Sequence, residues 1–570
     1  GSISRSITVG SNQDAVLNSS LNLQLAGMLG NNTEIRATIT DNNIPVQSDG
    51  YTQQLREFDR VYIELENSDF GLLRAGDYNM TSTSNHFLKF DKRISGAGVF
   101  TGIPVGERRI PIIAQGGIAR GKFSRNRFQG QEGNQGPYKL VGVNGERFVI
   151  IISGSERVYI DGVLMKRGQQ NDYVMDYNAG EITFTSLRPI TKESRIVIEF
   201  QYTEQNYLRS VAFGSTGFEN DRVKTSVQFY TEQDSKNQPL TQELSDPEKQ
   251  ILSNVGDRLD EALVSTIRPS EFRDDIVLYR LTDSLGVDSV LVYSIDSNLT
   301  LYQAAFAFVG SNRGNYIQAQ NNANGRVFRW VPPVNGVPQG SYEPVKLLTA
   351  PNQLQILTAE TEALIGENQK VRIDLAASKN DINLFSGEDK GNDIGAAGKF
   401  EYEIEGKLGK RKWFSSLRHE FNQENFRTIE RIRNVEFARD WNLPLNFNGA
   451  VQLSGITLGI KGDSSQLAYD MDHLSFNGYS GLRNTISGRL KDQENIGHFN
   501  GSWLNSNDSL GQSDFLRENS LFSHYITPGF WVGLSTTGEL NKRIRNGTDT
   551  LRSSSYRFLE YRLFTGVGDT

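Results

Sequence analysis

The 570-residue sequence contains no cysteine, so disulfides and cysteine-based metal sites are excluded. This absence suits an exported bacterial protein. Apolar runs never reach the roughly 18 residues of a membrane-spanning helix, and the longest of them are the size of a strand. The five histidines are dispersed, with no pair at metal-binding spacing, and no metal site is expected.

An excess of basic charge is also lacking, because 60 Lys and Arg stand against 67 Asp and Glu for a net charge of −7. A nucleic-acid partner is therefore not expected. The sequence has neither a G-x-x-x-x-G-K-[ST] phosphate loop nor a G-x-S-x-G nucleophile elbow. No carboxylate pair stands out as a general acid and base. These absences predict a protein that is not an enzyme and needs no cofactor.

What the sequence has instead is 55 Gly, 31 Phe, 21 Tyr and many segments of alternating apolar and polar residues. The clearest is 398–406, where one face of a strand is apolar and the other is charged. The apolar set is Phe400, Tyr402 and Ile404. The charged set is Lys399, Glu401, Glu403 and Glu405. A soluble sheet on a core fits this pattern, and so does an outer-membrane barrel with its apolar face on lipid.

The connections between the predicted strands separate these two folds. Short, tight turns alternate with long polar loops, such as the one at 42–57, along most of the chain. This alternation is typical of an up-and-down barrel with one tight rim and one elaborated rim. An array of β-sandwiches would need regular linkers, and the 15 prolines are too few and too dispersed to supply them. We therefore expect an all-β fold, an antiparallel transmembrane barrel of about twenty strands.

Two long insertions interrupt the predicted barrel on its elaborated rim. Residues 1–122 hold the first seven strands, and 123–205 form a small inserted β-domain. A hairpin at 206–232 precedes a second, mixed α+β insertion at 233–353, and 354–570 supply the remaining strands. Both insertions would be extracellular, by the usual orientation of such barrels.

Each insertion has its own sequence signals. In the first, the aromatic residues Tyr159, Tyr173, Tyr177 and Phe184 are expected to form a core rather than a ligand platform. In the second, Ser245-Asp246-Pro247-Glu248 predicts a helix start. A Pro/Gly-rich loop with Trp330, Pro333 and Pro338 is a candidate partner-binding loop, although Trp330 could equally fasten the loop to its own fold.

Four tryptophans fall at or near predicted strand ends, where barrels place aromatic side chains at the lipid–water interface. They are Trp413, Trp441, Trp503 and Trp531. Scattered aromatics in a sandwich would be core residues instead, so the pattern supports the barrel without deciding for it.

Several blocks of the sequence form a recognisable set, at residues 154–162, 171–184, 190–191, 194–196, 324–327, 333–340 and 435–442. Together they resemble large outer-membrane β-barrel proteins of Bacteroidota. Residues 21–41 and 52–55 also resemble these proteins and, more distantly, the SprA-type translocon barrel of the type IX secretion system. The resemblance implies a barrel fold and an outer-membrane location, and it carries over no catalytic residues. The proteins it resembles are longer, which implies that these 570 residues are part of a longer chain.

Two functions are compatible with these observations. The first is a non-enzymatic structural or accessory subunit of an outer-membrane protein assembly or secretion machine, with the insertions docking other envelope proteins. The second is a channel or nutrient-uptake transporter whose insertions gate the pore or bind substrate. A cell-surface adhesin is a weaker third possibility. In each case the lipid bilayer of the outer membrane is a direct partner.

Overall fold

The computed structural model describes the chain except at residues 11–12, 31, 43–59, 107, 120, 144, 147, 204–205, 241–242, 285, 323–324, 445–446, 448, 493, 528 and 569–570. The predicted polar loop at 42–57 lies outside the described residues apart from Asn42, which ends a strand. In the described ranges, no helix is long and apolar enough to cross a membrane.

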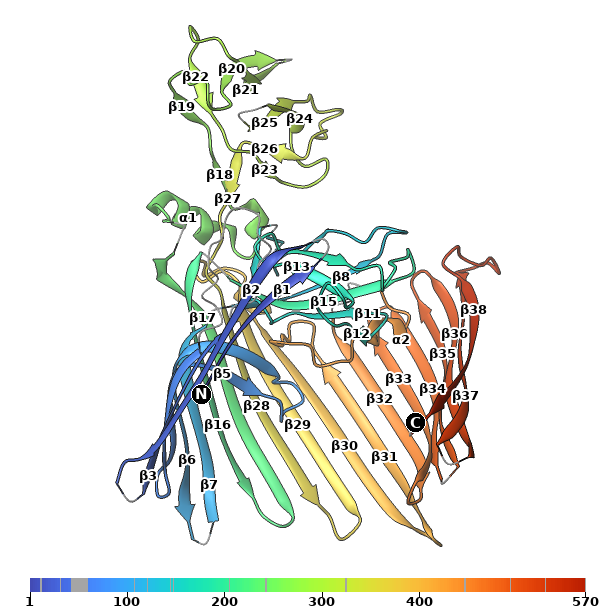
Figure 1. Cartoon of the computed structure of the whole chain (residues 1–570). Helices are drawn as coiled ribbons and strands as arrows, with labels where there is room; N and C mark the ends of the chain where they lie inside the picture. Colours follow the sequence, from blue (N-terminus) through green and yellow to red (C-terminus); the bar gives the residue numbers. More distant parts are fainter. Residues whose placement is uncertain are drawn as a thin grey trace.

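A single sheet of 20 strands organises the molecule (Figure 1). Its strands are β1 (Ser2–Gly10), β2 (Gln13–Met28), β3 (Thr33–Asn42), β4 (Arg60–Asn67), β5 (Gly71–Ser82), β6 (Phe90–Val105), β7 (Arg108–Ala119), β16 (Tyr207–Glu219), β17 (Val223–Pro239), β28 (Gln353–Leu364), β29 (Gln369–Asp381), β30 (Ile394–Leu408), β31 (Arg411–Asn422), β32 (Val451–Lys461), β33 (Ser465–Phe476), β34 (Tyr479–Lys491), β35 (Asn495–Asp508), β36 (Gly511–Thr527), β37 (Phe530–Arg545) and β38 (Tyr556–Val567).

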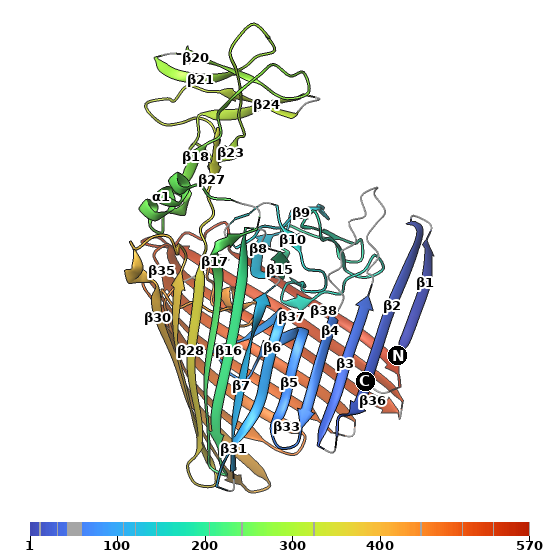
Figure 2. The ribbon, with the colours of Figure 1, turned by 90° about the vertical axis from the view of Figure 1, so that its left-hand side faces the viewer.

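These strands pair antiparallel with their neighbours in chain order, with β7 beside β16 and β17 beside β28. The predicted strand number and antiparallel order are therefore confirmed. The sheet curls strongly, so that β33 to β38 lie behind β1 to β5 in Figure 2. Among the described pairings, none joins β1 to β38.

The two faces of the sheet differ sharply because side chains alternate along each strand. One face carries the cross-strand row Tyr402, Leu417, Ile456 and Met471, in which the last three side chains are exposed apolar groups. The neighbouring positions put Glu401, Arg418, Gly455, Asp472 and Arg483 in one row on the opposite face. We call the first the outer face and the second the inner face.

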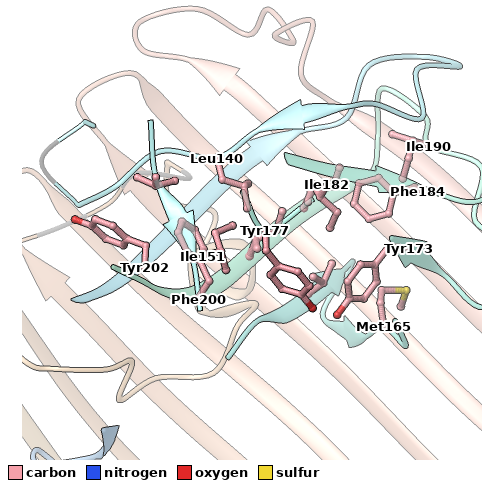
Figure 3. Close-up of a cluster of buried hydrophobic side chains, with 14 residues drawn as sticks. Leu140, Ile151, Met165, Tyr173, Tyr177, Ile182, Phe184, Ile190, Phe200 and Tyr202 are labelled. Atoms are coloured by element: carbon pink, nitrogen blue, oxygen red, sulfur yellow. The ribbon is translucent and has the colours of Figure 1, made fainter. Parts of the chain in front are cut away.

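Residues 123–204, between β7 and β16, fold into a compact unit at one end of the sheet. Its strands are β8 (Lys122–Gln129), β9 (Tyr138–Lys139), β10 (Ile150–Ile151), β11 (Arg157–Ile160), β12 (Val163–Leu164), β13 (Tyr173–Asp176), β14 (Glu181–Phe184) and β15 (Arg195–Thr203), arranged in a five-stranded and a three-stranded sheet. The core contains Tyr173, Tyr177 and Phe184, as predicted (Figure 3). The prediction for Tyr159 is wrong: this side chain is half-buried and faces Arg431 of another segment.

The second excursion, between β17 and β28, begins with α1 (Asp246–Val255), at the predicted helix start. Ser245 caps it, because the carboxylate of Glu248 accepts a hydrogen bond from the Ser245 backbone N–H at 2.7 Å. A two-stranded stalk, β18 (Leu263–Ser265) with β27 (Val345–Leu347), then leads away from the sheet (Figure 1). We call residues 263–347 the distal segment.

Two four-stranded sheets form the outer part of the distal segment. They contain β19 (Arg268–Ser270), β20 (Tyr279–Ser284), β21 (Val287–Tyr293), β22 (Leu301–Gln303), β23 (Ala307–Phe308), β24 (Tyr316–Asn322), β25 (Gly325–Trp330) and β26 (Tyr342–Glu343). Their core is largely aromatic, with Tyr279, Tyr316 and Phe328 among its buried members. This segment folds around its own core.

Two connections fold back against the inner face. The loop between β5 and β6, residues 83–89, buries Phe87 and Leu88 completely. The connection between β31 and β32, residues 423–450, contains the short helix α2 (Phe437–Asp440) and is called the inner loop. Charged side chains of the inner loop pair with the sheet, as at Arg433–Glu420 and Asp440–Arg517.

Candidate functional site on the inner face of the sheet

The strand that displays the clearest alternation, β30, contributes its charged side chains to the inner face. Lys399 pairs with Glu401 at 3.2 Å, and Glu405 pairs with Lys412 at 3.3 Å and Lys461 at 2.7 Å. Glu403 lies on the same face by the alternation of the strand. Phe400, Tyr402 and Ile404 lie on the outer face. That the outer face meets lipid stays a prediction.

A network of ion pairs crosses the inner face of neighbouring strands. Arg418 of β31 pairs with Asp472 of β33 at 2.6 Å, and Arg483 of β34 pairs with the same carboxylate at 3.2 Å. Arg418 reaches Asp472 across Gly455, which lies between them in the register, whereas Arg483 is the direct cross-strand partner of Asp472. A Cβ at Gly455 would stand 2.1 Å from Asp472 Oδ1 and 2.7 Å from Arg418 Nε, so a larger residue there would displace the pair.

The inner loop is anchored to this face by Trp441. Its indole is buried among Leu474, Leu504 and Phe515, and the guanidinium of Arg483 stacks 4.6 Å from the ring centroid. The hydroxyl of Tyr479 donates a hydrogen bond to the Trp441 backbone oxygen at 2.5 Å. The prediction that Trp441 is an interface aromatic is wrong, because the inner loop folds inward and this apolar patch on the inner face covers the indole.

Ion pairs fix the helix α2 beside this tryptophan. Asp440 pairs with Arg517 and lies 3.7 Å from Arg483. Arg439 pairs with Glu539 of β37 and, at 3.1 Å, with Glu436 in the preceding turn. Charged groups taken out of water need such partners, so each of these contacts specifies how the inner loop sits.

The inner loop and the loop 83–89 both contact the carboxylate of one residue of the sheet, Glu420. Glu420 of β31 pairs with Arg433 of the inner loop at 2.7 Å and with His86 Nε2 at 3.1 Å. The rings of Phe87 and Phe426 pack edge to face, 5.7 Å between centroids. Two connections far apart in sequence thus cover the inner face together.

The 123–204 segment docks on the inner loop rather than on the sheet alone. Arg195 pairs with Glu436 at 3.1 Å, and Arg431 pairs with Glu199 at 2.7 Å. The turn Asp161-Gly162 packs closely against the side chain of Glu436, since a Cβ at Gly162 would stand 2.6 Å from Glu436 Cγ. A direct contact to the sheet comes from Gln201, whose amide donates to the backbone oxygen of Asp91 at 2.6 Å.

Glu430 lies where the inner loop, the sheet and the 123–204 segment meet. Its carboxylate accepts the backbone N–H of Asp91 at 2.9 Å and lies 4.0 Å from Arg157. Burial raises the pKa of Glu430 above its ordinary value, and the hydrogen bond from Asp91 partly opposes this. A cavity of about 450 Å³ beside it is lined by Asn79, Arg93, Glu199 and Gln201 among others.

The other three predicted interface tryptophans divide between the faces. Trp413 and Trp503 lie on the outer face, where 37% and 52% of their surface is exposed. Trp531 is in register with Gly566 and shares the alternation of Glu539, which places it on the inner face. Trp531 thus shares a face with the ion pairs and not with Trp413 and Trp503, and a place at the lipid–water interface stays a prediction for all three.

The candidate partner-binding loop lies in the distal segment. Trp330 packs against the aromatic core that contains Tyr279 and Phe328, so it fastens the loop to its own fold. Pro333 is exposed and Pro338 is half-buried. Partner binding by this loop stays a prediction. Over the residues that the structure describes, no group of three or more His, Asp or Glu could hold a metal ion.

Sequence reasoning missed the role of the inner loop. A signal was present, since residues 430–441 read Glu-Arg-Ile-Arg-Asn-Val-Glu-Phe-Ala-Arg-Asp-Trp, with charges of both signs beside buried-type aromatics. Such a stretch is unusual for a solvated loop. Its partners, however, lie on strands as far apart in the chain as β6, β15, β31 and β37, which no local pattern connects to it.

Comparison with known proteins adds little to this geometry. Residues 123–204 match a family model described as a domain of unknown function, DUF8818. No curated protein matches the chain. Two structures of the P pilus usher PapC translocation pore are 9% identical, with TM-scores of 0.26 and 0.22. The alignments cover 98% of this chain and 96% and 95% of those chains. Scores this low carry no argument about this chain.

Proposed function

We propose that the chain is an outer-membrane β-barrel that serves as a non-enzymatic subunit of an outer-membrane protein assembly or secretion machine. In this proposal the sheet closes between β1 and β38, the outer face meets lipid, and both excursions lie outside the cell. An even number of antiparallel strands permits this closure, since β1 and β38 then run in opposite directions.

The two-faced sheet carries the proposal. A row such as Leu417, Ile456 and Met471 leaves apolar side chains exposed across several strands, and a soluble protein rarely exposes so extended an apolar surface. The opposite face holds paired charges, which a wet interior tolerates and lipid does not. Membrane embedding accounts for both faces at once.

The covering of the inner face favours a subunit that is closed at rest. The inner loop, the loop 83–89 and the 123–204 segment share contacts through Glu420, Glu430 and Glu436. Passage of a substrate through the proposed barrel would require these ion pairs to break. The distal segment stands away from the sheet and is free to dock an envelope protein (Figure 1).

The alternative, a channel or uptake transporter, is favoured by one observation. The contacts that hold the 123–204 segment to the inner loop are largely ion pairs such as Arg195–Glu436 and Arg431–Glu199, which a charged solute could compete for. In that case the same segment would act as a gate.

Purification from the native membrane in mild detergent separates the two functions. A subunit of a machine is expected to co-purify in fixed ratio with other envelope proteins and to conduct no ions in planar bilayers. If the protein runs alone and conducts, the proposal fails and the channel is supported.

The assignment of faces has a test of its own in the pair Tyr402→Arg and Glu403→Gln. A charge at Tyr402 on a lipid-facing position costs about 2–4 kcal/mol, so insertion into the outer membrane should drop. Neutralising Glu403 on the inner face should leave insertion unchanged. Heat-modifiable migration on gels of membrane fractions measures both, and the reverse result would contradict the outer face as the lipid face.

A further inference from the structure

One face of the five-stranded sheet in the 123–204 segment is unusually rich in arginine. Arg125 and Arg127 lie on β8, Arg157 on β11 and Arg195 on β15. The register places Arg125 and Arg157 on either side of Glu199, and strand alternation puts the other two arginines on this same face. This face looks toward the inner loop, because Arg195 and Glu199 contact it.

The inner loop neutralises only part of this face. Glu436 pairs with Arg195, and Glu430 lies near Arg157. Opposite Arg125 the inner loop brings Arg431, a further positive charge, whose guanidinium pairs with Glu199. In the part of the chain that the structure describes, the guanidinium of Arg125 makes no hydrogen bond or ion pair. Arg127 has a further interaction within the protein.

The electrostatic balance at Arg125 follows from these neighbours. Burial lowers the pKa of Arg125 to about 10, and repulsion by Arg127 and Arg431 adds to this, while Glu199 alone opposes it. Burial and repulsion by Arg431 lower the pKa of Arg127 as well, again with only Glu199 opposing. A second anion beside Arg125 would favour the charged form of both arginines and so oppose the lowering of their pKa values.

We propose that Arg125, assisted by Arg127 and Arg431, binds a phosphate group. Among these three residues and Glu199, three positive charges face one negative charge. A phosphate monoester carries roughly −1.5 to −2 at neutral pH, which suits this balance better than a single carboxylate. Guanidinium groups bind phosphate oxygens in a bidentate fork, and residues two apart on a strand stand about 6.5 Å apart, so two can flank one tetrahedral anion.

The phosphate could belong to a lipid headgroup or to free phosphate, and two titrations distinguish these sources. The full chain, purified in detergent and phosphate-free buffer, is titrated calorimetrically with inorganic phosphate. It is then titrated with mixed micelles that contain phosphatidic acid, with phosphatidylcholine micelles as the reference. Binding of inorganic phosphate assigns the site to the free anion. Binding of phosphatidic acid alone assigns it to a lipid. Binding of neither overturns the proposal.

Variants then locate the site. Arg125→Gln should weaken binding about tenfold or more, because a charge-assisted fork is lost. Arg125→Lys keeps the charge without the fork and should lie between Gln and the native residue. Arg188→Gln is the matched control: this arginine lies in the same segment, half-exposed, and pairs with Asp172 at 2.9 Å. Native affinity in Arg125→Gln would overturn the proposal.

A measurement on the native sequence covers the case in which the variants fail to fold. Phenylglyoxal modifies accessible arginines, and mass spectrometry reads each position. The bound phosphate, or phosphatidic acid, should slow modification of Arg125 severalfold and leave Arg188 unchanged. Equal rates at Arg125 with and without the anion would overturn the proposal. The result does not depend on closure of the barrel or on a role in secretion.

Discussion

Residues 123–204 and the distal segment 263–347 both leave the sheet from the same end, but they meet the rest of the molecule differently (Figure 1). The first docks through ion pairs on the inner loop, as at Arg195–Glu436 and Arg431–Glu199. The second is joined by a stalk of two three-residue strands, β18 and β27. One excursion is therefore positioned by its surface charges, whereas the other is positioned by its tether.

The two segments, 123–204 and 263–347, also differ in how their cores and surfaces are built. The distal segment closes its two sheets on each other with tyrosines, since Tyr316 and Tyr279 hydroxyls accept the backbone N–H groups of Leu291 at 3.0 Å and Phe328 at 3.1 Å. The 123–204 segment has its own apolar core but turns an arginine-rich face to the inner loop. The first excursion is thus held against the inner loop, whereas the second keeps its contacts within its own core.

Removal of each excursion gives the largest expected difference. Lys122 and Tyr202 are cross-strand partners, and so are Ser265 and Val345, so a short Gly-containing turn can replace either 123–201 or 266–344. In the closed barrel proposed above, loss of 123–201 should create a conductance in planar bilayers that the native chain lacks, because a barrel of twenty strands encloses a wide interior. Loss of 266–344 should leave conductance unchanged. Equal conductance in both deletions would refute the distinction.

Two tryptophan substitutions test whether damage to the inner loop spreads further through the molecule than damage to the core of the distal segment. Trp441→Ala removes a completely buried indole and should cost about 3–5 kcal/mol of local stability. Hydrogen exchange should then rise across 423–450 and at the docked face of 123–204. Trp330→Ala removes a half-buried ring and should raise exchange only within the distal segment. Exchange changes that cross between the two regions would show that they are coupled.

Substitution of two aspartates compares the stability contributed by a partly buried ion pair with that of an exposed one. Asp440 pairs with Arg517 and lies near Arg483 on the inner face, so Asp440→Asn should weaken the anchoring of α2 by about 2 kcal/mol. Asp260 pairs with Arg313 at 2.9 Å near the stalk, with both side chains at least 60% exposed. Asp260→Asn should cost less than about 0.5 kcal/mol. Amide exchange in each region measures the cost, and a larger effect at Asp260 would contradict the comparison.

The smallest expected effect is a pH dependence in the distal segment. Burial raises the pKa of Glu343, while hydrogen bonds from Asn315 to its carboxylate oppose the shift. The folded segment therefore holds this proton more tightly than the unfolded chain does. Its contribution to stability is present below the ordinary glutamate pKa and is lost as pH rises through the raised value.

Glu343→Gln should remove this pH dependence from the distal segment alone. Glu430→Gln should do the same only at the inner loop, where burial also raises the carboxyl pKa. Hydrogen exchange between about pH 4 and pH 7, corrected for the intrinsic rate, separates the two regions. A Glu343→Gln variant that keeps the pH slope would contradict the assignment.

Much of the sheet could be predicted from local sequence. The alternation at Lys399–Glu405 separates charged from apolar faces because strand geometry alone fixes which side chains share a face. The start of α1 at Ser245 was accessible because a capping residue followed by proline marks a helix start within four residues. Trp441 was misplaced because no local pattern reveals that the inner loop folds inward and buries the indole.

The sequence by itself determined the strands, their number and the two-faced character of the sheet, since each depends on residues a few positions apart. Only the tertiary structure decided that the inner loop folds inward, that Glu420 joins Arg433 to His86, and that Arg431 faces the 123–204 segment. Glu199 and Arg431 are 232 residues apart, and ion pairs between any of the chain's 60 basic and 67 acidic residues are chemically alike. Their selection depends on which surfaces the folded sheet brings together.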